Sequence, residues 1–118
     1  MTFDSSCTSA EHPRVPPRVL TRPVVRERAA RMLRAAGDAQ RLALLELLDA
    51  GELCVTELAV LTGDAMPTVS QRLRQLKTEG LVSTRREGKH VHYALTDEHV
   101  RSLLHNILHH AAESVGLR

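Results

Sequence analysis

The fold of this chain is decided by residues 55–95, which read VTELAVLTGDAMPTVSQRLRQLKTEGLVSTRREGKHVHYAL. Residues 55–61 predict a short helix that ends at the turn signal TGD. Residues 66–79 predict a second helix, with a proline tolerated in its first turn and a glycine after its last residue. Residues 81–95 predict a β-hairpin around a turn at residues 87–89. A short helix, a turn, a second helix and a hairpin are the element order of a winged helix-turn-helix.

The predicted helix over residues 66–79 has two chemically different faces. Val69, Leu73 and Leu76 form an apolar stripe at helical spacing, which predicts its buried side. The opposite arc and its flanks carry hydroxyl, amide and guanidinium groups, which suit base edges and phosphates in a DNA groove. These residues are Thr68, Ser70, Gln71, Arg72 and Arg74, and the predicted hairpin adds the cations Arg85, Arg86 and Lys89. An ordinary solvated surface is the alternative for each of them.

Charge is distributed unevenly along the chain, although the formal net charge is only +2. Residues 66–92 carry six Lys or Arg against two acids, whereas residues 36–65 carry one Arg against six acids. A basic block beside an acidic one indicates an oriented surface. Because the basic block coincides with the predicted helix and hairpin, charge and element order together predict binding to double-stranded DNA.

Length and composition predict one domain with an aliphatic core. The chain has 118 residues, of which 42% are hydrophobic, with one Phe, one Tyr and no Trp. Four of the five prolines lie between Pro13 and Pro23, which predicts a flexible arm over residues 1–22 and a folded domain over residues 23–115. We expect a cytoplasmic protein without a membrane partner, because no apolar run approaches the roughly 20 residues of a spanning helix. Two cysteines, Cys7 and Cys54, fit a reducing compartment.

Helices are also predicted over residues 24–36 and 39–49, and after the N-cap Thr96 as far as about residue 114. The last helix carries a wide apolar surface made by Leu103, Leu104, Ile107, Leu108 and Ala111. An apolar terminal helix outside a winged domain is a natural dimer element when it pairs with the first helix. The predicted fold is therefore mainly α with a β-hairpin wing, as a homodimer held through its N- and C-terminal helices.

Histidines and acids form a constellation on the last helix. His99 and His110 are eleven residues apart and project within about 20° of each other, Glu113 follows close to them in projection, and Asp97 lies two residues before His99. Eleven residues span roughly 16 Å, whereas zinc lies about 2 Å from each ligand. One straight helix cannot gather these side chains around one ion.

Two antiparallel copies of the helix could gather them across a two-fold axis. Each of two equal sites would then hold two histidines and two carboxylates, a closed set that suits zinc and tolerates cobalt. A closed set favours structure or sensing over catalysis. A solvated, histidine-rich helix is the alternative, and His105 and His109 fit that alternative better because they lie off the stripe.

A second group of candidate ligands contains sulfur. Cys54 precedes the predicted helix over residues 55–61, and Glu57 follows three residues later. Cys7 and His12 lie on the predicted arm, which could deliver a thiolate and an imidazole to them. Such a softer site would accept zinc, cadmium or lead. A cysteine beside aliphatic residues is also typical of a small core position.

The stretches ELCV, TVSQRLRQL, EGLV and GKHVHYAL together resemble the core of the ArsR/SmtB family of bacterial metal-responsive repressors, over residues 24–115. The resemblance implies a dimeric winged helix-turn-helix protein that represses a metal efflux or sequestration gene and releases its operator when metal binds between the C-terminal helices. The zinc-sensing, SmtB-like subgroup has the pattern Asp-x-His, ten residues, His-x-x-Glu. Asp97, His99, His110 and Glu113 match that pattern in full.

The cysteine-based site of that subgroup is matched in part. Cys54 is in place, but Glu57 stands where an aspartate is more typical, and four residues separate Cys7 from His12 where three are usual. The arsenic-type Cys-x-Cys pair is absent because Thr56 fills its second place, so arsenite sensing is not expected.

Two other function classes remain to be separated from zinc sensing. A zinc hydrolase would need an open metal position and a general base in a pocket, and the sequence has no such pattern, so we do not expect an enzyme. A winged-helix regulator that responds to cadmium or lead, or to thiol oxidation through Cys54 and Cys7, is the remaining alternative. Mass spectrometry after mild oxidation, compared with zinc titration, would separate oxidation from metal binding.

Overall fold

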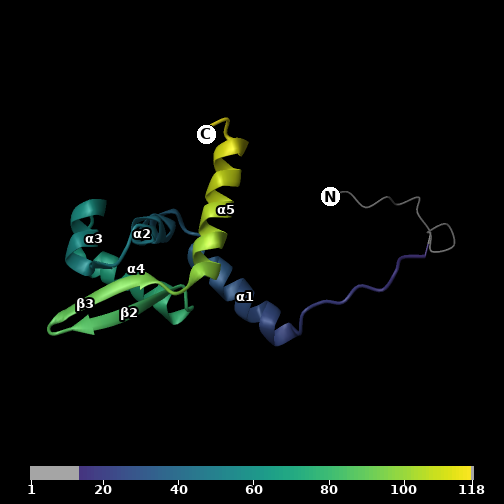
Figure 1. Cartoon of the computed structure of the whole chain (residues 1–118), viewed down its shortest axis with the longest axis horizontal. Coiled ribbons are helices and arrows are strands. Elements are labelled where there is room, and N and C mark those ends of the chain that lie inside the picture. The colour runs from purple at the N-terminus through teal and green to yellow at the C-terminus, as the bar shows by residue number, and fades with distance from the viewer. Residues whose placement is uncertain (1–13, 118) are drawn as a thin grey trace.

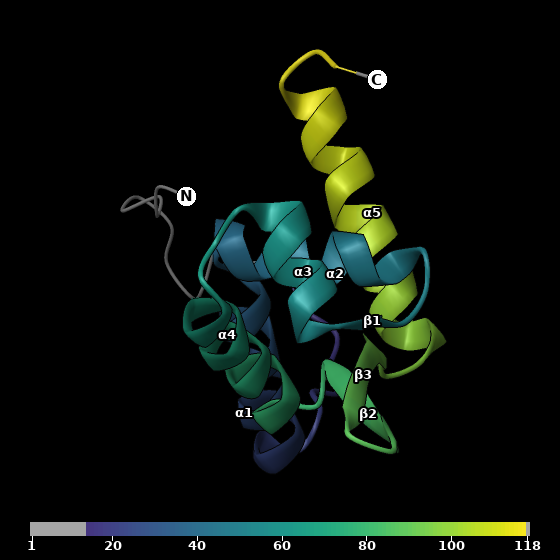
Figure 2. The same ribbon diagram turned by 90° about the vertical axis from the view of Figure 1, so that its left-hand side faces the viewer.

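The computed structural model describes residues 14–117, and its backbone forms five helices and a small sheet within that range (Figure 1). The elements are α1 (Pro23–Ala36), α2 (Ala39–Asp49), β1 (Leu53–Cys54), α3 (Val55–Thr62), α4 (Met66–Thr78), β2 (Val82–Glu87), β3 (His90–Leu95) and α5 (Glu98–Ser114). The succession of α3, a turn, α4 and the β2–β3 hairpin is the predicted winged helix-turn-helix. α1 and α5 both contact α2. α5 projects from the rest of the molecule in both views, whereas α1 runs away from α5 in Figure 1 and lies behind α4 in Figure 2.

The core is aliphatic, as the composition predicts. Its largest fully buried side chains are Leu44, Leu48, Leu58, Val69, Leu73, Leu76 and Leu81. They come from α2, α3, α4 and the start of the wing, and fully burying such a side chain contributes about 1.5–3 kcal/mol relative to leaving it exposed. The predicted stripe of α4 is confirmed, because Val69, Leu73 and Leu76 are 0% exposed. This burial determines which way the remaining side chains of α4 face.

The sheet has the strand order β1-β3-β2 and is antiparallel throughout. The wing pairs Val82 with Leu95 at its base and Glu87 with His90 at its tip. Gly88 takes φ +60° in the turn, a left-handed conformation that glycine adopts without steric cost. β1 was not predicted, because two residues are too short to show an alternating pattern. It joins the start of α3 to the wing by placing Cys54 opposite His92.

The start of α5 differs from the prediction. Asp97, not Thr96, is the N-cap, and its Oδ1 accepts a hydrogen bond from the Val100 amide at 3.1 Å. Thr96 still belongs to the end of the wing, because its hydroxyl donates to the Gly80 carbonyl at 2.7 Å. Aspartate caps a helix as well as threonine does, so the tertiary bond of Thr96 moves the cap by one residue. Residues 14–22 form no helix or strand, and residues 1–13 of the predicted arm lie outside the described residues.

An ionic contact fastens α5 to the end of α2. The Asp49 carboxylate accepts a hydrogen bond from Arg101 and lies 2.7 Å from His105 Nε2. The hydrogen bond with His105, followed by the charges of His105 and Arg101, holds the pKa of Asp49 below its ordinary value of 3.8. The apolar contact of α5 with the core is small, since only Val100 and Leu104 of this helix are buried.

We expect Asp49→Asn to destabilise the fold at neutral pH and to loosen α5 first. Because the folded state lowers the pKa of Asp49, its ionised form stabilises the protein above the unfolded pKa, and this contribution is lost as the pH falls through the folded pKa. The free energy of unfolding should therefore fall more steeply below about pH 4 in the wild type than in Asp49→Asn. Urea unfolding between pH 7 and pH 3 measures this, and equal pH slopes would contradict it.

Candidate DNA-reading face and metal-ligand positions

The outward face of α4 presents the polar side chains predicted to read DNA. Thr68, Gln71 and Arg74 are exposed, on the side away from the buried stripe. Ser70 is half-buried at the edge of this face. Hydroxyl, amide and guanidinium groups on an exposed helix of this kind can bond to base edges in a major groove.

Two of the predicted DNA cations are engaged within the chain. Arg72 Nη1 lies 2.8 Å from Asp64 Oδ2, an ion pair that ties α4 to the turn before it. Arg85 makes a two-pronged contact with Glu52, with nitrogen–oxygen distances of 2.8 and 3.1 Å, and a weaker one with Glu87 at 3.3 Å. The hydrogen bonds and charge of Glu52 raise the pKa of Arg85, and Arg85 in turn lowers the pKa of Glu52.

The free cations of the wing are therefore Arg86 and Lys89. Both are exposed, and neither lies within ion-pair distance of an acid in residues 14–117. Arg85 instead links β2 to the loop before β1 through its ion pair with Glu52. The sequence gives no signal for this pair, because Glu52 and Arg85 are 33 residues apart.

The four predicted ligands lie at the two ends of α5, two at each end. At the N-terminal end, Asp97 Oδ2 lies 3.7 Å from His99 Nδ1, and the His99 side chain is 98% exposed. The hydrogen bond from the Val100 amide is the main cause that lowers the pKa of Asp97. Near the C-terminal end, His110 and Glu113 are both exposed, but the imidazole nearest to Glu113 is His109, at 3.5 Å.

The structure does not bring the two pairs together. Within residues 14–117, no group of three or more His, Cys, Asp or Glu side chains is arranged to hold a metal ion. This agrees with the expected axial separation along one helix. A four-ligand site on α5 therefore requires a second chain.

At the predicted sulfur site, Cys54 and Glu57 form the start of α3. The Cys54 amide donates to Glu57 Oε1 at 3.0 Å. This bond, and a further one with the Cys54 thiol, lower the pKa of Glu57. Cys7 and His12 lie outside the described residues. His92 was missed by the sequence analysis, although it lies directly across from Cys54, because that pairing depends on β1.

Exposed apolar side chains gather where α1 and α5 meet. Leu33 of α1 is 56% exposed, and Leu103 and Ile107 of α5 are 43% and 51% exposed. They line a groove of about 220 Å³ together with Ala36, Leu42 and Leu104. Exposed apolar patches of this kind mark interaction surfaces, and this one lies on the two helices predicted to form the dimer.

Comparison with known proteins decides the family. The family model of bacterial regulatory proteins of the arsR family matches residues 38–84, from the start of α2 into β2. The chain is 38% identical over 88 residues to a transcriptional repressor SmtB homolog from Synechocystis, which covers 75% of this chain and 67% of that protein. The chain belongs to the arsR family. It is also 38% identical to a cadmium resistance regulatory protein CadC homolog from Staphylococcus aureus, over 75% of this chain and 74% of that protein.

A solved structure described as a possible ArsR-family transcriptional regulator has the same fold. The homodimeric winged helix-turn-helix DNA-binding domain Mb0332 from Mycobacterium bovis superposes with a TM-score of 0.75 at 32% identity, covering 84% of this chain and 92% of that one. The winged helix-turn-helix fold is therefore confirmed, and so is the prediction of a DNA-binding regulator and not an enzyme. In residues 14–117, no helix of this arsR-family chain is long and apolar enough to cross a bilayer.

Proposed function

We propose that this arsR-family chain is a metal-sensing transcriptional repressor, with zinc as the favoured metal, which binds operator DNA as a homodimer and releases it when metal bridges the α5 helices. The observation that carries the proposal is the layout of α5. It has one exposed ligand pair at each end, Asp97 with His99 and His110 with Glu113. The uncovered apolar side chains Leu103 and Ile107 lie between them.

A homodimer would cover the apolar groove and complete the metal sites. Two α5 helices that run antiparallel would pack their exposed apolar side chains together and bring the start of each helix beside the end of the other. The M. bovis neighbour is homodimeric, which supports a two-fold assembly. We propose that the predicted domain, residues 23–115, makes both the DNA contacts and this dimer contact, with residues 1–22 as the arm.

The donor set fits a small divalent metal ion. Two imidazoles and two carboxylates suit zinc and tolerate cobalt. Asp97 Oδ1 holds the start of α5, whereas Asp97 Oδ2 lies on the side of His99, where it can act as a ligand. The second site would use Cys54 and Glu57 with Cys7 and His12, and its thiolates would favour cadmium or lead. The name of the cadmium resistance regulatory protein CadC homolog supports a response to metal.

The chain has a physical route from α5 to the DNA-reading face. Bound zinc would supply a rigid cross-link between the two α5 helices. Each α5 is tied to α2 through Asp49, and α2 shares its core with α4. The spacing of the two α4 helices therefore follows the angle between the α5 helices. If that spacing departs from the roughly 34 Å between successive major grooves, the operator is released.

We propose contacts with DNA from two parts of the winged domain. Thr68, Ser70, Gln71 and Arg74 would meet base edges in the major groove, while Arg86 and Lys89 of the wing would contact phosphates. Arg72 and Arg85, also predicted to contact DNA, would have to exchange Asp64 and Glu52 for a phosphate.

The proposal is tested by operator binding with and without zinc. We expect stoichiometric zinc to weaken operator binding by about 5–150-fold, the usual range of coupling between two sites. Fluorescence anisotropy with a labelled operator measures it, and Cys54→Ser should keep the response. If Cys54→Ser abolishes the response, the sulfur site is the sensor. If zinc has no effect but mild oxidation does, the thiol alternative replaces metal sensing.

A further inference from the structure

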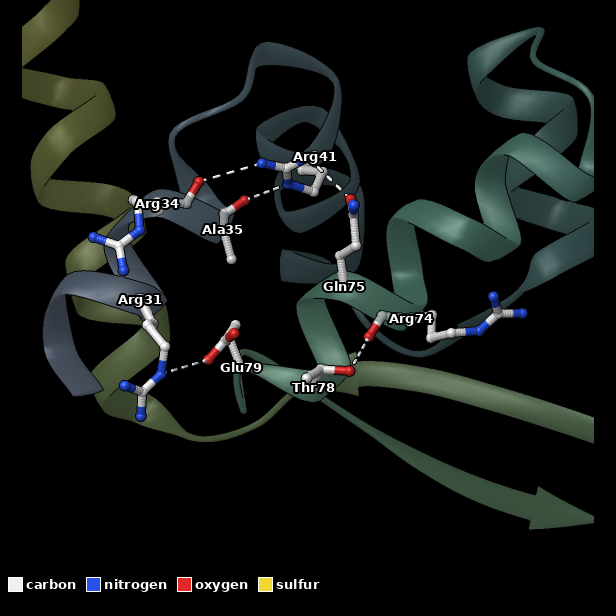
Figure 3. A pocket seen from close by; sticks show the side chains of 8 residues that line it. All are labelled: Arg31, Arg34, Ala35, Arg41, Arg74, Gln75, Thr78 and Glu79. Carbon is white, nitrogen blue, oxygen red and sulfur yellow. Dashed lines mark hydrogen bonds and ion pairs between the residues drawn. The ribbon is translucent and has the colours of Figure 1, made fainter. Parts of the chain in front are cut away.

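A basic hollow lies between α1, α2 and α4 (Figure 3). Its volume is about 420 Å³, and it is lined by Arg31, Arg34, Ala35, Arg41, Arg74, Gln75, Thr78 and Glu79. We call it the arginine hollow. Four guanidinium groups against one carboxylate leave it with an excess of positive charge. Of the four arginines, only Arg74 takes part in the DNA contacts proposed above.

Arg41 lines the arginine hollow, and three hydrogen bonds hold its guanidinium in place. Its Nε donates to the Ala35 carbonyl at 2.6 Å, and its other nitrogens donate to the Arg34 carbonyl at 3.2 Å and to Gln75 Oε1 at 3.0 Å. These bonds tie the end of α1 to the side of α4. The nearest carboxylate oxygen, on Asp38, is 4.0 Å from the guanidinium. Arg41 is therefore positioned mainly by neutral groups, which leaves much of its charge uncompensated.

The remaining charges of the arginine hollow are not balanced either. Glu79 is shared by two arginines, at 2.6 Å from Arg28 and 3.7 Å from Arg31. Arg34 and Arg74 are exposed and have no ion-pair partner within 4.0 Å in the part of the chain that the structure describes. In Figure 3, the guanidinium groups of Arg31 and Arg34 lie on the α1 side, while that of Arg74 points away from them.

The arginine hollow adjoins the DNA-reading face of α4. A second hollow, of about 220 Å³, shares Arg41 and Gln75 with it and is also lined by Thr68 and Gln71. A helix that enters a major groove is flanked by the phosphate backbones that border that groove. A backbone that passes Thr68 and Gln71 on this side of α4 would next meet Arg41, Arg34 and Arg31.

We propose that the arginine hollow seats a backbone phosphate of the DNA whose major groove α4 enters, and this rests on the proposed DNA binding. Guanidinium groups bind phosphate oxygens in a forked, charge-assisted geometry. Contacts of this kind position a protein on the duplex without reading its sequence. The hollow thus adds α1 and α2 to the DNA interface, beside α4 and the wing.

Arg34→Gln is the variant that isolates this contact. The side chain of Arg34 is exposed and makes no hydrogen bond within residues 14–117. Its backbone carbonyl accepts from Arg41 and from the Gly37 amide, and glutamine retains that carbonyl. Arg26→Gln is the matched control, because Arg26 is an exposed arginine of the same helix that lines neither hollow. Both variants remove one positive charge per chain.

The test measures binding to an operator duplex and to an unrelated duplex of equal length at several salt concentrations. Each lost phosphate contact makes the negative slope of log K against log salt shallower by about 0.9. A dimer of Arg34→Gln loses two such contacts, so its slope should be shallower by about 1.8. Its affinity for the two duplexes should fall by the same factor, and zinc should still release it from the operator. Arg26→Gln should keep the wild-type slope.

Three outcomes would overturn the proposal. An unchanged slope in Arg34→Gln, while the wild type binds DNA, removes the arginine hollow from the interface and leaves the proposed function standing. If the wild-type protein binds neither duplex, both the proposed function and the phosphate contact at the arginine hollow are wrong. The third outcome combines two results: inorganic phosphate binds the wild type but not Arg34→Gln without DNA, and the salt slope of DNA binding is unchanged. The arginine hollow would then bind a free anion and not the DNA backbone.

Discussion

Ile107→Asp is expected to convert the dimer into monomers and to weaken operator binding by about 10²–10⁴-fold. Ile107 is 51% exposed in the single chain and lies in the apolar groove where α1 meets α5. In a dimer whose second chain covers this groove, the new carboxylate would be buried among apolar side chains without a partner, which is strongly unfavourable. A monomer has one α4 helix to place on the operator instead of two. Linked binding of two such helices accounts for a 10²–10⁴-fold difference in operator affinity.

Analytical ultracentrifugation gives the oligomeric state, and anisotropy titration gives the operator affinity. Asn106→Asp is the matched control, because it adds the same charge at the neighbouring exposed position of α5. It should remain dimeric. Circular dichroism should show that Ile107→Asp is still folded, since this side chain is not part of the buried core. A dimeric Ile107→Asp protein would place the interface elsewhere.

His99→Ala is expected to abolish the zinc response while leaving operator affinity without zinc unchanged within about twofold. The His99 side chain is 98% exposed, and Asp97 is its one ionic neighbour within residues 14–117, so its loss costs the fold little. Removing one of four ligands breaks the proposed bridge between two α5 helices. The ratio of operator affinities without and with zinc should therefore fall from about 5–150 to about 1.

His110→Ala and His109→Ala sharpen this test at the other end of α5. The sequence pattern selects His110, but the structure places His109 nearest to Glu113, at 3.5 Å. We expect His110→Ala to lose the zinc response and His109→Ala to keep it, in the same anisotropy assay. The reverse result would replace His110 by His109 in the ligand set. Normal zinc-driven release by His99→Ala would mean that the site on α5 is not the sensor.

Sequence periodicity determined most elements of the fold and the faces of its helices. Val69, Leu73 and Leu76 recur at helical spacing, and all three are fully buried. The exposed polar face of α4 follows from their burial, because side chains on one helix keep fixed angles to one another. The same reasoning placed the candidate ligands of α5 at opposite ends of one helix, and the structure keeps those two pairs apart.

Tertiary structure alone decided the pairings between distant residues. Nothing local indicates that Arg85 binds Glu52, that Asp49 holds Arg101 and His105, or that His92 lies opposite Cys54. The arginine hollow likewise exists only because α1, α2 and α4 pack around it. Periodicity is a property of a single helix or strand, whereas an ion pair across 33 or 52 residues depends on how separate elements are placed against a common core.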